Sequence, residues 1–362
     1  MKKFISIIIA VFILTNISAA AYETSAKSAC LIEAKSGEVV YAVNEKEKLP
    51  MASTTKIMTA IVALTYCNLD DVATVSNDAV LTEGSSAYLK AGAQITIRDL
   101  LYGLMLNSGN DAAVAIAQYI SGSEKDFAKL MTKTAKKIGA RHTNFTNPNG
   151  LNDDMHYTAA YDLALIARYA MENEAFREIV STTSYTADID NTPVPYTNHN
   201  RLLRTYDGCV GIKTGFTKAA GRCLVTAVTR QGMTFIAVTL NDPNDWADHK
   251  AMYDEVFNEY SMHTVAHKGD DVKYLGADLV YGADLDIPAR NGDTDSVKIK
   301  VKAGKIIPPL DKGEKVGIAQ ALKNGQVMAE VDVCMRDAIY QKPSFMSEIS
   351  KRFDRILRMI FL

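Results

Sequence analysis

The chain has 362 residues, of which 48% are apolar and 23% charged, and its formal net charge is −2. This balance is ordinary for a globular protein and excludes the strongly basic field that attracts nucleic acid. The five cysteines are scattered and odd in number, which excludes a disulfide scaffold, and the six histidines lack ligand spacing. We therefore expect neither a metal site nor a cofactor.

The N-terminus has the three parts of a secretory signal peptide. Two lysines precede the apolar run Phe4–Ile17, and the small residues Ser18–Ala21 follow. This order predicts a signal peptide over residues 1–21, cleaved near Ala21. The run is short for a membrane span, which needs about 20 residues, although an uncleaved anchor is the alternative. We expect an exported protein, located at the outer face of the cytoplasmic membrane or in the cell wall.

The next 240 or so residues alternate between strand and helix patterns. Residues 28–42 read as two short strands around a turn, and a helix is predicted from Ser53 to about Tyr66. Further predicted elements are two helical segments in 98–120 broken at 107–110, helices near 123–138 and 158–172, strands at 207–215, 221–229 and 233–240, and a helix at 247–260. Strands at both ends with helices between predict one α+β domain over residues 22–260, whose N- and C-terminal strands share a sheet.

A different pattern begins after about Met262. Residues 273–289, 296–304 and 327–340 alternate with period two and are separated by Gly, Asn and Asp turns. They predict a small all-β domain over residues 261–341, without a catalytic arrangement of its own.

The last stretch, residues 342–362, has helical periodicity. Its apolar positions are Phe345, Ile349, Phe353, Ile356, Leu357 and Ile360, with Lys351, Arg352, Arg355 and Arg358 between them. This is a basic amphipathic helix, too polar to span a bilayer but suited to an anionic membrane surface. We interpret it as a membrane anchor; a helix packed on its own domain is the alternative.

The run MASTTKIMTA contains the first candidate for chemistry. Ser53 and Lys56 are three residues apart, so on a helix they lie on one face. A serine hydroxyl is a poor nucleophile until a base takes its proton. Lysine can be that base when an apolar setting and a second cation lower its pKa. Alone, S-x-x-K is weak evidence, because Ser-Thr-Thr before a helix also suits an N-cap.

Two further motifs follow in order. Ser108-Gly109-Asn110 lies in an interhelical break, and Lys213-Thr214-Gly215 lies at the end of a predicted strand. Each alone is ordinary, since a strand-end lysine is usually a solvated charge. Together with S-x-x-K they nearly reproduce the trio of class A β-lactamases and penicillin-binding proteins, whose second motif is written S-D-N. The order, the structural context and the exported chain together argue against coincidence.

The sequence resembles the serine-type D-alanyl-D-alanine carboxypeptidases, the low-molecular-mass penicillin-binding proteins that trim peptidoglycan side chains. The stretches ASTTKIMTA, LLYGLMLNSGNDAA, HYTAAYDLALIARYA and GIKTGFTKAAG carry the resemblance. It covers about residues 25–260 and extends more loosely through the β domain to the C-terminal helix. It implies a β-lactamase-like fold, an antiparallel sheet with a helical subdomain, followed by a small all-β domain and an amphipathic helix.

The resemblance also implies roles for individual residues. Ser53 would attack the bond between two D-alanines, with Lys56 as its base. Ser108 would pass the proton to the leaving D-alanine, and Asn110 would position Lys56 and the substrate backbone. Lys213 and Thr214 would hold the substrate carboxylate, or that of a β-lactam. Gly215 would leave room for the substrate, and the backbone N–H groups of Ser53 and Phe216 would form the oxyanion hole.

Two departures from the family pattern stand out. Many members have a histidine where this chain has Asn149, although His156 still matches. No arginine can be assigned to the substrate carboxylate: His249 and Lys250 lie in the right region, but we expect both to cap or solvate a helix.

Two other functions compete. A class A-like β-lactamase shares the nucleophile and the fold, but uses a glutamate to activate the deacylating water, and residues 140–154 contain none. A non-catalytic peptidoglycan-binding protein would not need Ser53, Lys56 and Lys213.

Cys209 and Cys223 could pair, although we expect free thiols because a chain of this size needs no disulfide.

Overall fold

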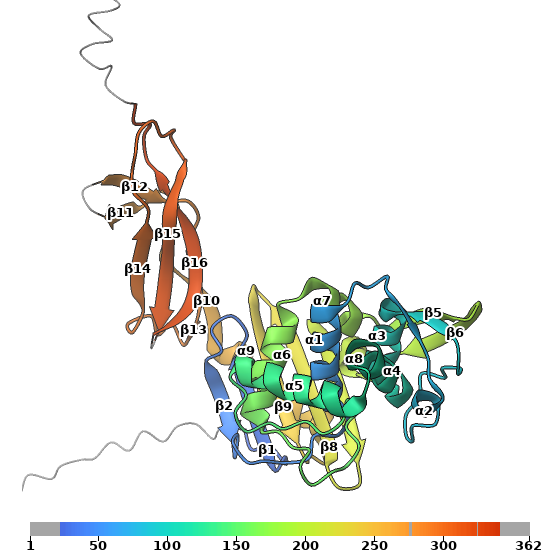
Figure 1. Ribbon diagram of the computed structural model, residues 1–362. Coiled ribbons are helices and arrows are strands. Elements are labelled where there is room, and N and C mark those ends of the chain that lie inside the picture. Colours follow the sequence, from blue (N-terminus) through green and yellow to red (C-terminus); the bar gives the residue numbers. More distant parts are fainter. Residues whose placement is uncertain (1–21, 275–276, 324, 341–362) are drawn as a thin grey trace, which may run out of the picture.

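The computed structural model describes residues 22–274, 277–323 and 325–340. The predicted signal peptide and the predicted anchor helix lie outside these residues. The described chain forms two units, a larger α+β domain and an elongated all-β domain that projects from it (Figure 1).

A five-stranded antiparallel sheet organises the larger domain. Its strands, in spatial order, are β2 (Val39–Val43), β1 (Ser28–Glu33), β9 (Met233–Leu240), β8 (Gly221–Arg230) and β7 (Cys209–Thr217). Because β1 pairs with β9, the first and last strands of the domain are neighbours in the sheet. This confirms the prediction that N- and C-terminal strands share one sheet.

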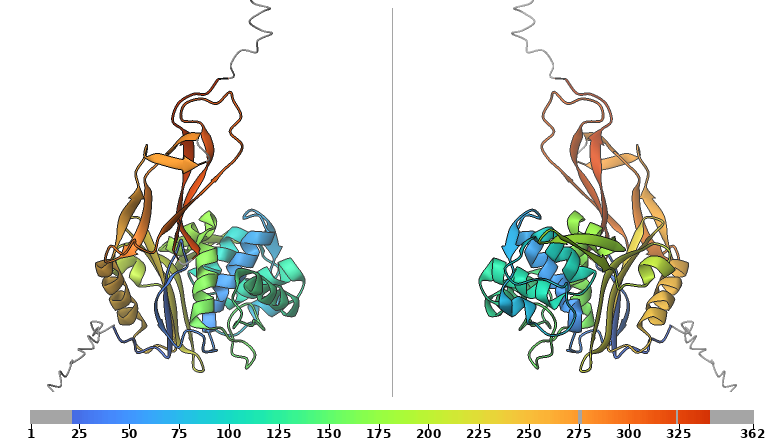
Figure 2. Two further views of the ribbon diagram at one scale, coloured as in Figure 1. Left: turned by 90° about the vertical axis from the view of Figure 1, so that its left-hand side faces the viewer. Right: turned by 90° about the vertical axis from the view of Figure 1, so that its right-hand side faces the viewer.

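Helices cover both faces of this sheet. On one face lie a 3-10 turn (Ala52–Thr55), α1 (Lys56–Tyr66), α3 (Ile97–Met105), α4 (Asn110–Ser121), α5 (Glu124–Ile138), α6 (Ala160–Met171) and α7 (Glu174–Ser181). The opposite face is covered by α9 (Asp245–Glu259), and the two turned views in Figure 2 show the sheet between these layers. Strand alternation explains the two cores, since Val225 and Ala227 face the helical subdomain whereas Val228 faces α9.

Short elements complete the domain. They are α2 (Asn77–Val80), α8 (Leu202–Thr205) and two hairpins, β3 (Val72–Thr74) with β4 (Gln94–Thr96) and β5 (Ser184–Ile189) with β6 (Thr192–Thr197). The hairpin β5–β6 and helix α7 were not predicted. The hairpin contains two prolines, which weaken a strand pattern in sequence but are tolerated in a two-stranded ribbon.

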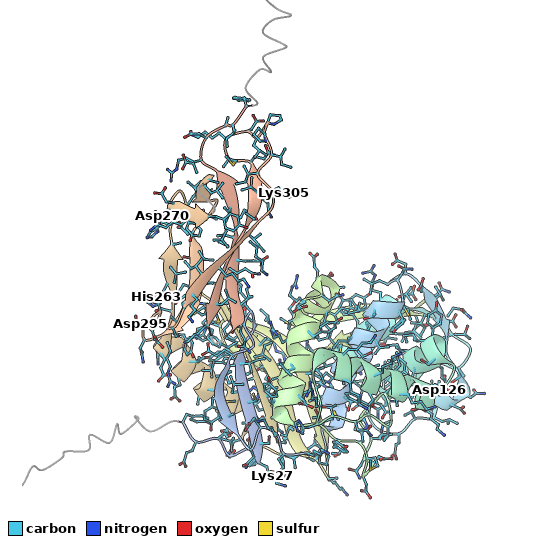
Figure 3. The ribbon with its side chains drawn as sticks, turned by 60° about the vertical axis from the view of Figure 1, so that its left-hand side comes forward. Lys27, Asp126, His263, Asp270, Asp295 and Lys305 are labelled. Atoms are coloured by element: carbon cyan, nitrogen blue, oxygen red, sulfur yellow. The ribbon has the colours of Figure 1, made fainter. Side chains whose placement is uncertain are left out.

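The all-β domain contains a second five-stranded antiparallel sheet. Its order is β11 (Asp271–Tyr274), β12 (Ala277–Tyr281), β16 (Gln326–Met335), β15 (Lys315–Lys323) and β14 (Lys298–Ala303). A pair of strands, β10 (Tyr260–Ala266) and β13 (Leu285–Arg290), connects it to α9. Figure 3 shows Asp270 and Lys305 on this domain, and Asp126 of α5 on the side of the larger domain away from it.

The two domains meet through polar contacts. Lys323 of β15 lies 3.6 Å from Glu38, and Arg290 of β13 lies 2.8 Å from Glu259. A cleft of about 1170 Å³ lies between α6, α7 and β16, and it is lined by none of the residues predicted to form the catalytic site. All residues predicted to form the catalytic site lie in the larger domain.

Candidate active site

The predicted nucleophile lies in a strained turn. Ser53 belongs to the 3-10 turn Ala52–Thr55, which leads directly into α1. Ala52 has a φ of 49°, a conformation that non-glycine residues seldom adopt and that is frequent at functional sites. The turn leaves Ser53 partly exposed, while Lys56, at the start of α1, is fully buried. Lys56 Nζ lies 3.0 Å from Ser53 Oγ.

Two further oxygen atoms surround the side-chain nitrogen of Lys56. Nζ donates hydrogen bonds to Asn110 Oδ1, at 2.7 Å, and to the backbone oxygen of Asn149, at 2.6 Å. Both oxygens are pure acceptors, so each must receive an N–H. A neutral amine has two N–H groups and one lone pair. When the two N–H groups bond to these carbonyls, the lone pair faces Ser53.

The environment of Lys56 favours this neutral form. Burial lowers its pKa well below the ordinary value, and the positive charge of Lys213 lowers it further. Asp111 opposes the shift as the weakest of the three influences. The two conditions that the sequence argument required, an apolar setting and a second cation, are both present.

The second motif begins α4. Ser108 is buried with a φ of 59°, and Asn110 is the first residue of the helix. The amide of Asn110 is fixed from both sides, because its Nδ2 donates to the backbone oxygen of Glu83 at 2.6 Å while its Oδ1 accepts from Lys56. This orientation leaves Oδ1 as the only amide atom that can face Lys56.

The third motif lies on the edge strand of the sheet. Lys213 is in the middle of β7, not at its end, because the strand continues to Thr217. Its side chain is 1% exposed, so it is not the solvated edge charge that a strand-end lysine usually is. Burial lowers its pKa to about 7, and Nζ donates to the backbone oxygen of Thr214 at 3.0 Å. Phe216, further along β7, is exposed.

The third motif also meets the nucleophile turn directly. A Cβ added at Gly215 would lie 3.0 Å from the backbone nitrogen of Ser53 and 3.1 Å from that of Thr54. Only glycine lets β7 approach this turn so closely without displacing it. The structure thus brings Ser53, Lys56, Asn110 and the strand of Lys213 together.

The loop between α5 and α6 contains Asn149 and His156, which the sequence singled out without indicating their contacts. It carries the Asn149 carbonyl to Lys56, and a Cβ added at Gly150 would lie 2.0 Å from the backbone oxygen of Ala52. Its His156 contacts Thr55 in the nucleophile turn, at 2.7 Å. Backbone carbonyls have no signature in sequence, so the Asn149 contact could not have been read from it.

His199 is a residue that the sequence did not indicate. It follows β6 and is solvent-exposed, and partial desolvation by its neighbours and then the charge of Lys213 lower the pKa of its ring. It is therefore a titratable group at the border of the candidate site, in a segment, TNHN, that carries no recognisable motif.

The expectation for His249 was wrong. It does not cap or solvate a helix, because it is fully buried between α9 and the sheet. Its ring nitrogens lie 2.7 Å from Thr226 Oγ1 and 3.0 Å from Thr239 Oγ1, and burial lowers its pKa to about 3. Lys250 is partly exposed, as expected.

Other predictions concern cysteines, metals and membranes. All five cysteines, Cys30, Cys67, Cys209, Cys223 and Cys334, are free thiols, as favoured from the sequence. Among the described residues, no cluster of His, Cys, Asp and Glu is arranged to hold a metal ion. None of the helices in this part of the chain is long and apolar enough to cross a bilayer.

Comparison with protein families gives two matches. A family model described as D-alanyl-D-alanine carboxypeptidase matches residues 15–244. A second, described as the C-terminal domain of penicillin-binding protein 5, matches residues 260–341.

Individual relatives agree with these matches. The D-alanyl-D-alanine carboxypeptidase DacF of Bacillus subtilis is 34% identical over 331 residues, covering 86% of this chain and 85% of the relative. DacC of Escherichia coli is 30% identical over 339 residues, covering 89% and 84%. The crystal structure of penicillin binding protein 5 from Haemophilus influenzae superposes with a TM-score of 0.68 at 26% identity, covering 89% of this chain and all of that one.

Proposed function

This chain belongs to the D-alanyl-D-alanine carboxypeptidase family of low-molecular-mass penicillin-binding proteins, and we propose that its reaction runs through an acyl-enzyme on Ser53. It is a serine-type hydrolase of cell-wall metabolism. Its substrates are peptidoglycan stem peptides that end in D-alanyl-D-alanine, and β-lactam antibiotics bind as inhibitors. The pentapeptide side chain loses its terminal D-alanine.

The observation that carries the proposal is the hydrogen-bond arrangement of Lys56. In the neutral amine the carbonyl oxygens of Asn110 and Asn149 take its two N–H groups, which leaves the lone pair for Ser53 Oγ, 3.0 Å from Nζ. In this state Lys56 accepts the proton of Ser53 as the hydroxyl attacks the substrate carbonyl. The pKa of Lys56 is lowered well below its ordinary value, so a neutral amine is available for this step.

The leaving D-alanine must receive a proton. Ser108 is the relay in this proposal, taking a proton from the Lys56 ammonium and delivering it to the departing amine. Asn110 holds Lys56 in place during both transfers, through the bond at 2.7 Å. Water then hydrolyses the acyl-enzyme at Ser53.

The third motif serves recognition and charge stabilisation. Lys213 and Thr214 bind the terminal carboxylate of the substrate, which lies along the free edge of β7 beside Gly215. The backbone N–H groups of Ser53 and Phe216 stabilise the oxyanion. Losing one such donor typically costs about 3–4 kcal/mol of transition-state stabilisation.

The β-lactamase alternative has less support. A class A enzyme needs a carboxylate that activates the deacylating water. The loop between α5 and α6 lacks a glutamate over residues 140–154, and it offers a backbone carbonyl to Lys56 instead. A slow deacylation, and so a long-lived penicilloyl adduct, follows from this difference.

We propose further that the enzyme acts outside the cytoplasmic membrane and is held at its surface by residues 342–362. The support is the N-terminal signal pattern and the basic amphipathic pattern of the last residues. The mature chain should bind vesicles that contain anionic phospholipid, and the chain ending at residue 340 should not. Equal binding of both forms to those vesicles contradicts the anchor.

Intact-mass spectrometry of residues 22–340 after brief exposure to benzylpenicillin tests the main proposal. We expect one penicilloyl group, mapped to Ser53 by peptide analysis. Intact penicillin and unmodified protein would contradict the proposed nucleophile. Hydrolysed penicillin and unmodified protein would support the β-lactamase instead.

A further inference from the structure

His156 is a buried histidine for which the proposed reaction has no role. It lies at the end of the loop between α5 and α6, and its side chain is 3% exposed. Both ring nitrogens have partners: Nε2 lies 2.7 Å from Thr55 Oγ1, and Nδ1 accepts the backbone N–H of Thr146 at 3.1 Å. The ring therefore connects the loop to the turn that carries Ser53.

The partners of His156 define its tautomer. The N–H of Thr146 can only donate, so Nδ1 must be unprotonated and the ring proton is on Nε2. Nε2 then donates to Thr55 Oγ1. Burial lowers the pKa of His156 to about 4, which keeps the ring neutral and this arrangement intact at neutral pH.

The contact with Thr55 is close to the reacting atoms. Thr55 is fully buried and immediately precedes Lys56, in the same 3-10 turn as Ser53. Since the side chain of Thr55 accepts from His156, the position of the ring constrains the turn. Ala52 has a φ in the left-handed region, which is strained for a non-glycine residue. Such a conformation persists only when contacts with neighbouring segments enforce it, and the bond to His156 is one of these contacts.

The contact with Thr146 shapes the loop itself. Three residues after Thr146, the same loop presents the backbone oxygen of Asn149 to Lys56 at 2.6 Å. One residue earlier, the backbone oxygen of Pro148 accepts from Thr59 Oγ1 of α1, also at 2.6 Å. The bond from Thr146 to His156 closes the loop across its base, which fixes where the Asn149 carbonyl points.

We propose that His156 is a positioning residue for acyl transfer, coupling the loop that presents the Asn149 carbonyl to the turn that carries Ser53 and Lys56. By fixing the positions of the loop and of the turn, His156 keeps the lone pair of Lys56 directed toward Ser53 Oγ. The inference rests on the proposed function, because it assumes that Lys56 is the base. His156 does not touch substrate and transfers no proton.

Two substitutions separate the two bonds of the ring. His156→Asn places an amide oxygen near the Nδ1 position and keeps the bond to Thr146, but loses the one to Thr55. His156→Gln places an amide N–H near the Nε2 position and keeps the bond to Thr55. Thr55→Val removes the hydroxyl at nearly constant volume, and Thr55→Ser restores it.

The measured quantities are the rate constant for acylation of Ser53 by benzylpenicillin and the dissociation constant of the preceding non-covalent complex. For His156→Asn and Thr55→Val we expect acylation to slow by about 10–100-fold, the usual effect of misplacing a reacting group by about 1 Å. The dissociation constant should change little, since neither side chain is proposed to contact the substrate. Thr55→Ser should acylate at nearly the wild-type rate.

His249 provides a matched control. It is a buried neutral histidine bonded to two threonines, but on the α9 face of the sheet. His249→Asn should lower the melting temperature as much as His156→Asn does and leave acylation per folded molecule unchanged. An equal loss of acylation in both variants would reduce His156 to a contributor to general stability and overturn the proposal.

The remaining outcomes are equally decisive. Wild-type acylation rates in folded His156→Asn and Thr55→Val overturn the inference while leaving the proposed function intact. If His156→Asn does not fold, the acylation rates of Thr55→Val and Thr55→Ser test the inference: slow acylation in the first and a nearly wild-type rate in the second support it, and equal rates overturn it. If the wild-type protein itself forms no adduct at Ser53, the proposed function fails, and that result is visible before any variant is compared.

Discussion

Lys56 Nζ lies 2.6 Å from the backbone oxygen of Asn149, and the contact involves the main chain and not the Asn149 side chain. The side-chain Oδ1 of Asn149 instead accepts the backbone N–H of Leu151 at 3.0 Å. The position at which many family members have a histidine thus contributes to the site in this chain through an atom that every residue type possesses.

Substitution of Asn149 should therefore be tolerated. Asn149→Ser keeps a side-chain acceptor for Leu151 and the carbonyl for Lys56, so acylation by benzylpenicillin should stay within about threefold of wild type. Asn110→Ala is the comparison, because Asn110 contacts Lys56 through its side chain, and we expect a loss of about 10²-fold. Equal losses in the two variants would contradict a backbone role for Asn149.

Removal of the base should abolish rapid acylation. Lys56→Ala should slow penicilloylation of Ser53 by about 10²–10⁴-fold, the usual contribution of general base catalysis. The fold should persist, since an alanine at this position is a good helix former and removes a buried polar group. Stopped-flow acylation with circular dichroism checks both statements, and a full acylation rate in a folded variant would exclude Lys56 as the base.

The pH dependence of carboxypeptidase activity should reflect Lys213. Its pKa is lowered to about 7, and only its protonated form attracts a carboxylate. The value of kcat/KM reports on the free enzyme, so it should fall as pH rises above about 7. An analogue whose terminal carboxylate is amidated is the control and should lack this decline. An identical decline for both substrates would assign it to another group.

Lys213 should also lower the free energy of unfolding of the protein. Its pKa in the folded protein, about 7, lies below the ordinary 10.5, so folding disfavours the charged form. The destabilisation is complete below pH 7 and disappears as pH rises toward 10.5. Lys213→Met should thus stabilise the protein by about 1–2 kcal/mol at pH 6, with loss of activity. Urea unfolding at pH 6 and pH 10 should show a smaller gain at the higher pH.

Gly150 should tolerate no side chain. A Cβ there would lie 2.0 Å from the backbone oxygen of Ala52, and its φ is 93°. Gly122 is the control, because it also has a positive φ, 71°, but has open space around it. Gly122→Ala should cost on the order of 1 kcal/mol and spare acylation. Gly150→Ala should cost more and also slow acylation, because it displaces the turn that carries Ser53.

The sequence predicted the parts of this protein whose patterns are local. The helix after Ser53, the break before α4 and the three long strands of the sheet were recognised because apolar periodicity and turn residues mark them. The spacing of Ser53 and Lys56 was informative for the same reason, since three residues along a helix bring two side chains to one face.

Contacts between distant segments were not predictable in this way. His249 looked like a surface residue on a helix, and only the packing of α9 on β8 and β9 buries it. The role of the loop between α5 and α6 depends on a carbonyl and on a histidine 101 positions from its partner Thr55. Neither produces a pattern that periodicity or composition can detect.

The pairing of β1 with β9 has a consequence for the order of events during synthesis. Cys30 of β1 lies opposite Val238 of β9. During synthesis β1 therefore stays without this pairing partner until roughly two hundred further residues have been added. Such non-local pairing slows folding. β7, which carries Lys213, joins the sheet only through β8, and β8 through β9. An incomplete nascent chain therefore contains Ser53 but no assembled active site. Ser53 should not react with substrate or β-lactam until β9, β8 and β7 have joined the sheet.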